Sequence, residues 1–295
     1  MSKDDAQTSI PKTNDDLASH PTIFATDLLK GQTVFVSGGG SGIGRATAWL
    51  AGRLGARVII SGRKEEKLAT VVESMGEHGI TDAHYQVLDI RDSEAVKTGL
   101  ESAFEQAGNI DLLINSAGGQ FPQASIDYTE KGWQTVINTN LHGSWHMMHH
   151  AAQCWRQGTS GGSVVNIVVV NQGLYGVAHT SAARAGVIAF SQKAAVEWAS
   201  HGIRVNCVAP GSIETEGWAV YPEEARSRYP RTNPLMRSGS PWEIAEAVIF
   251  VGGPGGRFIN GEVLVVDGGG QHWGEIWTTG KPEYYAAATR LWDDG

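Results

Sequence analysis

The stretch Thr33-Val-Phe-Val-Ser-Gly-Gly-Gly-Ser-Gly-Ile-Gly44 decides how the rest of the chain is interpreted. Its first residues are mostly β-branched or aromatic and favour a buried strand, and a cluster of glycines follows them. Ile43, Ala46, Leu50 and Leu54 then recur at spacings of three and four residues, which predicts an amphipathic helix. A strand, a glycine turn and a helix in this order bring backbone N–H groups and a helix N-terminus to a pyrophosphate.

Three glycines of this stretch have separate roles in that geometry. Gly38 permits a tight turn, Gly42 lets a phosphate approach the backbone, and Gly44 lets the helix pack closely on the sheet. The spacing is Gly-x-x-x-Gly-x-Gly, not the commoner Gly-x-Gly-x-x-Gly. A glycine triplet alone also occurs in ordinary turns, but the flanking strand and helix favour a nucleotide site.

The composition is that of an ordinary globular protein and excludes several classes of function. The 295 residues are 41% hydrophobic and 18% charged, with a formal net charge of −8. This negative charge argues against nucleic acid or a membrane surface as a partner. Only two cysteines occur, Cys154 and Cys207, which excludes a disulfide framework and favours buried, apolar thiols in a reducing compartment. Because no apolar run approaches the ~18 residues of a membrane span, we expect a cytoplasmic protein.

Further apolar segments follow the first strand and alternate with amphipathic helices. The predicted strands after the first are 57–61, 84–88, 110–114, 163–170, 203–208 and 263–266. This alternation predicts an α/β fold, a Rossmann-type, doubly wound, seven-stranded parallel sheet with helices on both faces, in a single domain. Ligands of such sheets bind beyond the carboxyl ends of the strands, where the glycine clusters and Asp89 are expected.

The two ends of the chain differ in composition from residues 23–270, which we expect to form the nucleotide-binding domain. Residues 1–22 are polar and predict a mobile tail. Residues 271–295 carry several tryptophans and tyrosines between glycines and prolines. This aromatic extension is interpreted as a strap over the core, a subunit interface or a lid over the substrate.

Residues 28–270 resemble the short-chain dehydrogenase/reductase family. Its landmarks occur in order: the glycine loop, Asp89-Ile90, Asn115-Ser116-Ala117-Gly118, Asn138-Thr139-Asn140-Leu141, Pro210-Gly211-x-Ile213-x-Thr215 and Asp267-Gly268-Gly269. The resemblance implies an oxidoreductase with a small-molecule substrate, assembled as a homo-oligomer (tetramer or dimer). It also implies that the dinucleotide is bound by Gly38, Gly40, Ser41, Gly42, Ile43, Gly44, Arg63, Lys64, Asp89, Ile90, Asn115, Ala117, Gly118, Arg184, Pro210, Gly211, Ile213 and Thr215.

Three stretches resemble a narrower branch of the family, the peroxisomal trans-2-enoyl-CoA and 2,4-dienoyl-CoA reductases and their bacterial relatives. They are Gly118-Gly119-Gln120-Phe121, Lys131-Gly132-Trp133, and Ser181 to Val187 leading to Glu197-Trp198-Ala199. This resemblance implies an acyl-CoA as a candidate substrate and a place in fatty acid metabolism.

The residues after the second predicted strand favour NADP over NAD. Enzymes that use NAD usually place a carboxylate there to bond the ribose 2′-hydroxyl. This chain instead has Ser61-Gly62 followed by Arg63 and Lys64, with no acid before Glu65. A guanidinium matches a 2′-phosphate. The alternative is that Arg63 merely begins a polar helix.

The chain departs from the family's usual catalytic residues, a serine and a Tyr-x-x-x-Lys pair. Counted back from Ser181-Ala-Ala-Arg, Arg184 stands at the lysine position and Thr180 at the tyrosine position, and the fifth strand ends in valines. We expect Arg184 to bond the nicotinamide ribose. Thr180 is too weak an acid to replace a phenol and is expected only to hydrogen-bond.

Such a site suits the reduction of an activated C=C bond in an enoyl thioester, because the oxygen to be stabilised is an enolate. The candidate catalytic residues are Asn140, Arg184, Thr180 and Tyr175, with His142 and His179 as further candidate donors. Two alternatives stay open. One is an alcohol or carbonyl oxidoreductase that uses Tyr175, and the other is a catalytically weak dinucleotide-binding protein.

Histidines at helical spacing form one further cluster. His142, His146 and His150 recur every four residues, with His149 beside them. Zinc also needs supporting carboxylates, and no acidic residue occurs between Gly132 and Glu197. We therefore predict no metal site here.

Overall fold

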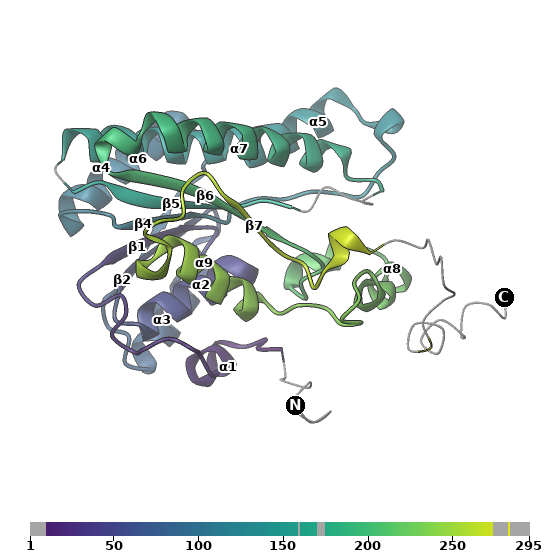
Figure 1. The fold of residues 1–295 in the computed structure, drawn as a ribbon, viewed down its shortest axis with the longest axis horizontal. Coiled ribbons are helices and arrows are strands. Elements are labelled where there is room, and N and C mark those ends of the chain that lie inside the picture. Colours follow the sequence, from purple (N-terminus) through teal and green to yellow (C-terminus); the bar gives the residue numbers. More distant parts are fainter. Residues whose placement is uncertain (1–9, 159, 170–174, 274–282, 284–295) are drawn as a thin grey trace.

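A parallel sheet of seven strands runs through the molecule between two layers of helices (Figure 1). The structure is a computed structural model that describes residues 10–158, 160–169, 175–273 and 283. The strands are β1 (Thr33–Ser37), β2 (Arg57–Gly62), β3 (Ala83–Val87), β4 (Leu112–Asn115), β5 (Gly162–Ile167), β6 (Ile203–Pro210) and β7 (Val263–Val266). Their order across the sheet is β3-β2-β1-β4-β5-β6-β7. The predicted fold class is confirmed.

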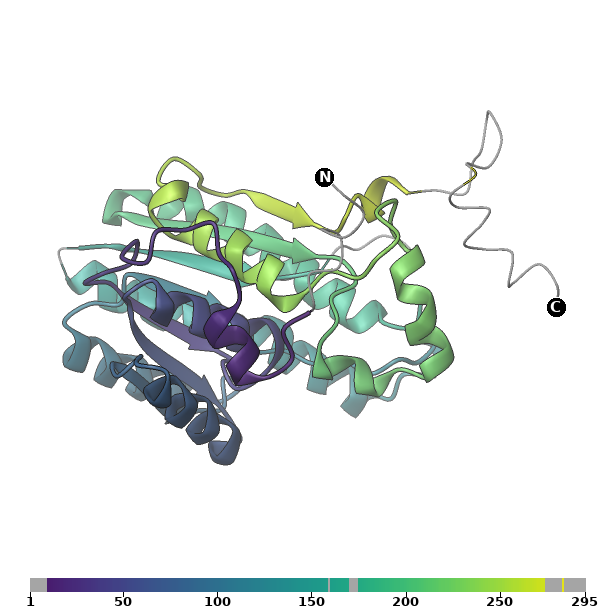
Figure 2. The same cartoon turned by 90° about the horizontal axis from the view of Figure 1, so that it is seen from below.

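The helices divide between the two faces of the sheet according to their apolar stripes. One layer holds α2 (Gly42–Arg53), α3 (Glu65–Glu77) and α9 (Pro241–Gly252), and the other holds α4 (Ser93–Ala107), α6 (Ser144–Gln157) and α7 (Ala178–Glu197). Each layer closes its own hydrophobic core, with Trp49 and Trp242 in the first and Trp155 in the second. Figure 2 shows the first layer from outside. Helices on both faces explain why β1 and β4 are buried along their whole length.

The order of the strands reverses between β1 and β4. From β1 the chain proceeds outward to β2 and β3, then returns to β4 and proceeds the other way. At such a switch point the connections leave in opposite directions, which opens a crevice beyond the carboxyl ends of the two strands. The glycine loop after β1 and the segment after β4 border this crevice.

Regular structure begins earlier than the sequence predicts. Residues 14–19, assigned to the mobile tail, form the short helix α1 (Asn14–Ser19). Thr13 and Asp16 form a reciprocal cap at its start, and Leu17 is 1% exposed in the core beside α2. The burial of Leu17 and the cap at Thr13 stabilise this helix, although the polar composition of residues 1–22 predicts a tail. Residues 1–9 and most of the aromatic extension (274–282 and 284–295) lie outside the described residues.

One long helical segment between β4 and β5 has three parts. It begins as α5 (Glu130–Ile137), continues through the π-helical turn Asn138–Gly143, and ends as α6. A π-helical turn inserts an extra residue and re-aims the side chains around it, and such turns are frequent at functional sites. Asn140 lies within this turn.

Two strands end two or more residues away from their predicted ends. β5 ends at Ile167 rather than at residue 170. β6 extends past 208 to Pro210 because Ala209 and Pro210 pair with Val265 and Val266 of β7. The remaining helix, α8 (Glu223–Arg228), and the 3₁₀ turns 216–220 and 229–231 follow β6. No helix in the described part of the chain is long and apolar enough to cross a membrane.

Candidate functional site

A cavity of about 390 Å³ lies at the switch point, beyond the carboxyl ends of β1, β2 and β4. Its walls come from the glycine loop, the start of α3, the segment after β4 and the segment after β6. The predicted dinucleotide residues that line it are Gly38, Gly40, Ser41, Gly42, Ile43, Arg63, Lys64, Asp89, Ile90, Ala117, Gly118 and Thr215. The structure therefore brings residues from distant parts of the sequence to one cavity.

The glycine loop is held tightly against the segment after β4. Gly38 has a φ of +77°, and a β-carbon there would lie 2.7 Å from the backbone nitrogen of Ala117. Only glycine fits both constraints. Gly44 does not line the cavity, because it packs the first turn of α2 against the carbonyl of Gly38, 2.3 Å from where a β-carbon would be. The roles expected for these two glycines agree with this geometry.

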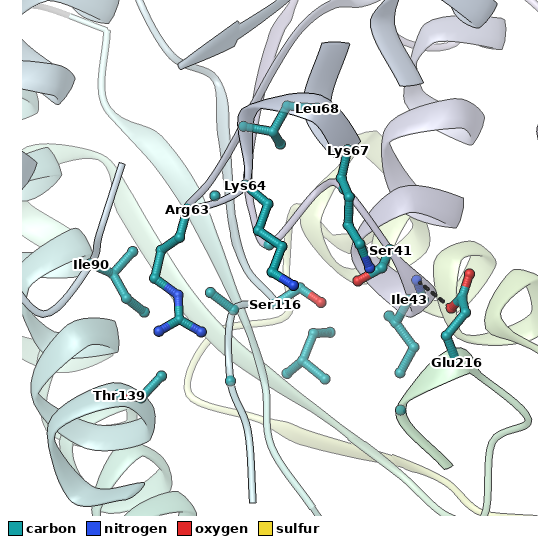
Figure 3. A pocket seen from close by; sticks show the side chains of 18 of the residues that line it. Ser41, Ile43, Arg63, Lys64, Lys67, Leu68, Ile90, Ser116, Thr139 and Glu216 are labelled. Carbon is teal, nitrogen blue, oxygen red and sulfur yellow. Dashed lines mark hydrogen bonds between the residues drawn. The ribbon is translucent and has the colours of Figure 1, made fainter. Parts of the chain in front are cut away.

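Three cations project into the cavity from the end of β2 and the start of α3. Figure 3 shows Arg63, Lys64 and Lys67 pointing into the same space. Lys67 is absent from the sequence predictions, although its spacing of three residues from Lys64 places both on one side of α3. Asp89 also lines the cavity, and hydrogen bonds from Arg91 hold the pKa of its carboxyl below the usual range.

Arg184 is a buried cation with no acidic partner among the residues that the structure describes. It is 7% exposed, and its Nε and Nη1 donate to no atom of the described residues. Its Nη2 lies only 2.1 Å from the position that a β-carbon of Gly118 would occupy. Burial lowers the pKa of Arg184 to about 10, so the guanidinium stays charged at neutral pH. An unsatisfied buried cation marks a candidate ligand site.

Asn140 and Thr180 form a hydrogen-bonded pair beside this guanidinium. The Nδ2 of Asn140 donates to the Oγ1 of Thr180 at 3.0 Å and to the carbonyl of Gly119 at 2.9 Å. Its Oδ1 accepts from the backbone N–H of Gly119 at 3.0 Å. Both side chains are buried, and these three hydrogen bonds fix the carboxamide of Asn140. Because the hydroxyl of Thr180 accepts from Asn140, its own proton is free for another acceptor.

A row of polar side chains crosses the sheet below the cavity. Ser37, Asn115, Asn166 and Cys207 pair in register on β1, β4, β5 and β6. The Nδ2 of Asn115 donates to the Oδ1 of Asn166 at 2.8 Å, and Asn166 donates to Ser191 of α7 at 2.9 Å. Asn115, predicted to bind the dinucleotide, is thus hydrogen-bonded to its neighbours in the sheet and does not line the cavity.

Cys207 is buried as predicted, and burial raises the pKa of its thiol to about 11. Cys154, predicted to be buried, is only partly so.

The remaining predicted residues lie around the cavity and not in its wall. Pro210 ends β6, the N–H of Gly211 donates to Val266, and Ile213 pairs with Gly239. These contacts fix the segment after β6 in a position where Thr215 lines the cavity. Tyr175 lies in a turn and is 87% exposed.

His179 is fully buried and stacks on Tyr128 at 4.6 Å. Its Nδ1 accepts from the N–H of Thr180 at 2.8 Å, and burial lowers its pKa. The ring thus supports the backbone of Thr180. When Nδ1 accepts in this way, the ring proton is on Nε2, which is buried and bonds no atom of the described residues, so the role of His179 as a proton donor stays a prediction. His142 is exposed on the π-helical turn.

The other histidines of the cluster are bonded to protein atoms. His146 bonds the carbonyl of Ile90 at 2.9 Å, and His150 bonds Ser93 at 3.0 Å. Within the described ranges, no group of three or more histidine, cysteine, aspartate or glutamate residues is placed to hold a metal ion.

Two contacts of the segment after β6 are absent from the sequence predictions. Glu216 lines the cavity and bonds the glycine loop, and the side-chain amide of Gln120, outside the lining, donates to the hydroxyl of Tyr221. Both contacts join residues more than a hundred positions apart in the sequence. No motif or spacing signals them, because they depend on where the segment after β6 lies.

Comparisons with known proteins agree on one family. The family model described as enoyl-(acyl carrier protein) reductase matches residues 38–271. A peroxisomal 2,4-dienoyl-CoA reductase of Arabidopsis thaliana is 33% identical over 259 residues, 83% of this chain and 86% of the relative. The 3-oxoacyl-[acyl-carrier-protein] reductase FabG of Thermotoga maritima is 35% identical over 244 residues, 82% of this chain and 98% of the relative. The solved structure of the citronellol catabolism dehydrogenase AtuB of Pseudomonas aeruginosa PAO1 superposes with a TM-score of 0.76 at 39% identity, covering 85% of this chain and 99% of the other.

Proposed function

Because the chain belongs to the short-chain dehydrogenase/reductase family, we propose that it reduces the activated C=C bond of an enoyl thioester with NADPH. Members of this family are oxidoreductases that use a nicotinamide dinucleotide, and this class describes the chain as well. The two finer parts of the proposal are the choice of NADPH and the choice of an activated alkene, such as that of an acyl-CoA. Each rests on particular residues.

The residues of the cavity suit a dinucleotide. Gly42, the first residue of α2, has no side chain and a φ of +52°, so that an anion can approach its backbone N–H. Gly38, Gly40, Ser41, Gly42, Ile43 and Thr215 would hold the pyrophosphate, and Asp89 and Ile90 the adenine. When bound, the dinucleotide supplies a hydride. The protein supplies binding, orientation and charge.

The choice of NADPH rests on Arg63, Lys64 and Lys67. All three line the cavity and extend from the end of β2 and the start of α3, Arg63 on the side of Ile90 and Thr139 and Lys67 on the side of Ser41 (Figure 3). No carboxylate lies at the end of β2, where Ser61 and Gly62 precede Arg63. A 2′-phosphate placed there gains charge-assisted hydrogen bonds, whereas a 2′-hydroxyl leaves three cations without an anion.

The choice of an alkene rests on Thr180 and Arg184, and the hydroxyl of Thr180 is the observation that carries it. Reduction of a ketone leaves an alkoxide that must be protonated, and an aliphatic hydroxyl is too weak an acid for that step. Addition of hydride to the β-carbon of an enoyl thioester leaves an enolate, whose oxygen needs only hydrogen-bond donors. Thr180 offers such a donor, fixed by Asn140.

Arg184 has a supporting role in this mechanism. Its buried charge, with Nε and Nη1 unsatisfied, favours the development of negative charge in the substrate beside it. It also offers donors to the ribose hydroxyls of the dinucleotide. A proton from solvent on the α-carbon completes the saturated thioester.

A second candidate reaction is the reduction of a 3-oxoacyl thioester. It is favoured by the 35% identity to the FabG of Thermotoga maritima. It requires a proton donor, for which the sequence offers Tyr175, with His179 and His142 as further candidates.

Single-turnover loss of NADPH fluorescence separates the two reactions. Crotonyl-CoA, trans-2-decenoyl-CoA and 2,4-decadienoyl-CoA are compared with acetoacetyl-CoA, and Thr180→Val with Thr180→Ser. We expect rapid oxidation by the unsaturated thioesters, retained in Thr180→Ser and reduced about 10²-fold in Thr180→Val, as for loss of one oxyanion donor. Faster turnover of acetoacetyl-CoA that depends on Tyr175 would contradict the proposal. Tight NADPH binding without oxidation by either class would favour a dinucleotide-binding protein.

A further inference from the structure

Glu216 places a negative charge in a cavity that otherwise gathers donors and cations. Its Oε2 accepts a hydrogen bond from the backbone N–H of Gly42 at 3.1 Å, which Figure 3 shows as a dashed line. Its Oε1 lies 2.8 Å from the Nη2 of Arg45. One carboxylate thus binds both the first residue of α2 and a guanidinium on the same turn.

The N–H of Gly42 is the kind of group that binds phosphate. It is among the first N–H groups of α2, which have no partner within the helix and carry the positive end of its dipole. The space above Gly42 is open except for the segment after β6, since a β-carbon there would lie 3.5 Å from Thr215 and 3.9 Å from Oε2 of Glu216. Glu216 therefore satisfies a donor that the proposed function assigns to the dinucleotide.

We propose that Glu216 occupies the phosphate subsite of the glycine loop until the dinucleotide displaces it. This inference rests on the proposed function for the identity of the ligand, a pyrophosphate ester. The carboxylate of Glu216 and a phosphate oxygen of the dinucleotide compete for the N–H of Gly42. Both groups are negatively charged, so they repel each other when both lie beside this N–H. The dinucleotide must therefore break the two contacts of Glu216 before its pyrophosphate reaches α2.

Displacement releases Arg45 as well as the helix N-terminus. The guanidinium of Arg45 also donates from Nη2 to the carbonyl of Lys12 at 2.8 Å, and its buried Nε bonds no atom of the described residues. Once Glu216 leaves, the guanidinium of Arg45 loses its carboxylate partner, and its N–H donors become available to a phosphate. Arg45 is thus a second phosphate-binding residue that only the displaced state makes available.

Displacement of Glu216 is also transmitted along the chain, towards the residues beside the proposed substrate site. Glu216 begins the 3₁₀ turn 216–220, which leads directly to Tyr221. The hydroxyl of Tyr221 accepts a hydrogen bond from Gln120, two residues beyond Gly118 and its contact with Arg184. Binding of the dinucleotide at Gly42 is thereby linked to the wall beside Thr180.

The test compares Glu216→Gln with Glu214→Gln by calorimetry, with inorganic pyrophosphate and NADPH as ligands. Glutamine keeps the size of the side chain but removes the charge that opposes the ligand. Glu214 is a matched control, because it lies two residues away, pairs with Lys12 at 2.8 Å and does not line the cavity. We expect Glu216→Gln to bind both ligands at least about fivefold more tightly than the wild type, and Glu214→Gln to match the wild type within about twofold.

A second measurement detects movement of the 3₁₀ turn 216–220 by its tryptophan fluorescence. Trp218 lies in the 3₁₀ turn and packs edge-on against Tyr229 at 4.7 Å. Saturation with pyrophosphate should change the tryptophan emission of the wild type, and the change should be absent from Trp218→Phe. Unaltered affinity in Glu216→Gln, or unaltered emission at saturation, would overturn displacement. Failure of NADPH alone to bind would instead contradict the proposed function, because pyrophosphate tests the subsite independently.

Discussion

The guanidinium of Arg184 lies directly against the α-carbon of Gly118, so that a β-carbon at residue 118 would come within 2.1 Å of Nη2. Arg184 comes from α7 and Gly118 from the segment after β4, and the Oδ1 of Asn140, from the π-helical turn, lies 2.9 Å from the same β-carbon position. This contact holds a buried charge beside the hydroxyl of Thr180. Four predictions follow from it and from the cations of the cavity.

Gly118→Ala should damage activity much more than stability. The added methyl group meets the flexible end of Arg184, which moves away at little cost to the fold but leaves its catalytic position. We expect kcat to fall about 10²-fold, in the range for misplacing a catalytic group by about 1 Å, with little change in Tm. Gly119→Ala is the matched control, because a β-carbon at Gly119 meets no atom within 4 Å. Equal activity in the two variants would contradict the role given to Arg184.

Arg184→Met should raise stability while lowering activity. Burial lowers the pKa of Arg184 to about 10, which means that the charged form, although still the populated one at neutral pH, is less stable in the folded protein than in the unfolded chain. At 1.36 kcal/mol per unit this corresponds to about 3 kcal/mol, part of which methionine should recover as free energy of unfolding. Urea unfolding at pH 7 measures the gain, and NADPH oxidation measures the loss. A destabilised Arg184→Met would show that the guanidinium has stabilising partners in the folded state.

The rate of reduction should be almost independent of pH between about 7 and 9. The groups nearest the proposed reaction do not change charge in this range, since Arg184 titrates near 10, Cys207 near 11, and burial lowers the pKa of His179. Above about pH 10 the rate should fall, because the guanidinium loses its proton as pH rises through its lowered pKa. The pH dependence of kcat tests this. A titration with a midpoint between 7 and 9 would reveal a different proton donor.

Lys67→Ala should weaken NADPH binding about tenfold and leave NADH binding unchanged. Loss of one charge-assisted hydrogen bond to the 2′-phosphate accounts for this size. Fluorescence titration with both dinucleotides measures it. Lys193→Ala on the exposed side of α7 should alter neither affinity. If Lys67→Ala weakens both dinucleotides equally, the three cations do not select NADPH.

The sequence was sufficient for the sheet because burial on both faces of parallel strands leaves a local apolar signal. It was also sufficient for most of the glycine loop, which lines the cavity, whereas the roles of Thr180 and Arg184 stay predictions. It was not sufficient for Glu216 or Lys67 as parts of the cavity. Glu216 reaches the cavity through the path of the chain after β6, and that path is set by contacts such as the pairing of Ile213 with Gly239. Local patterns carry no information about such contacts.

The helix α1 illustrates a different limit. Its polar composition predicts a tail, yet a cap at Thr13 and one buried leucine, Leu17, are enough to hold six residues against the core. The cytoplasmic location and the oligomeric state stay predictions.

The most direct measurement of the central claim locates the transferred hydride. The protein is given limiting NADPH deuterated at the reactive carbon, with an equal mixture of trans-2-decenoyl-CoA and 3-oxodecanoyl-CoA, and the products are analysed by mass spectrometry. The proposed function predicts decanoyl-CoA with deuterium on its β-carbon and no labelled 3-hydroxydecanoyl-CoA. Deuterium on carbon 3 of the hydroxy product would contradict it and identify the protein as a ketone reductase.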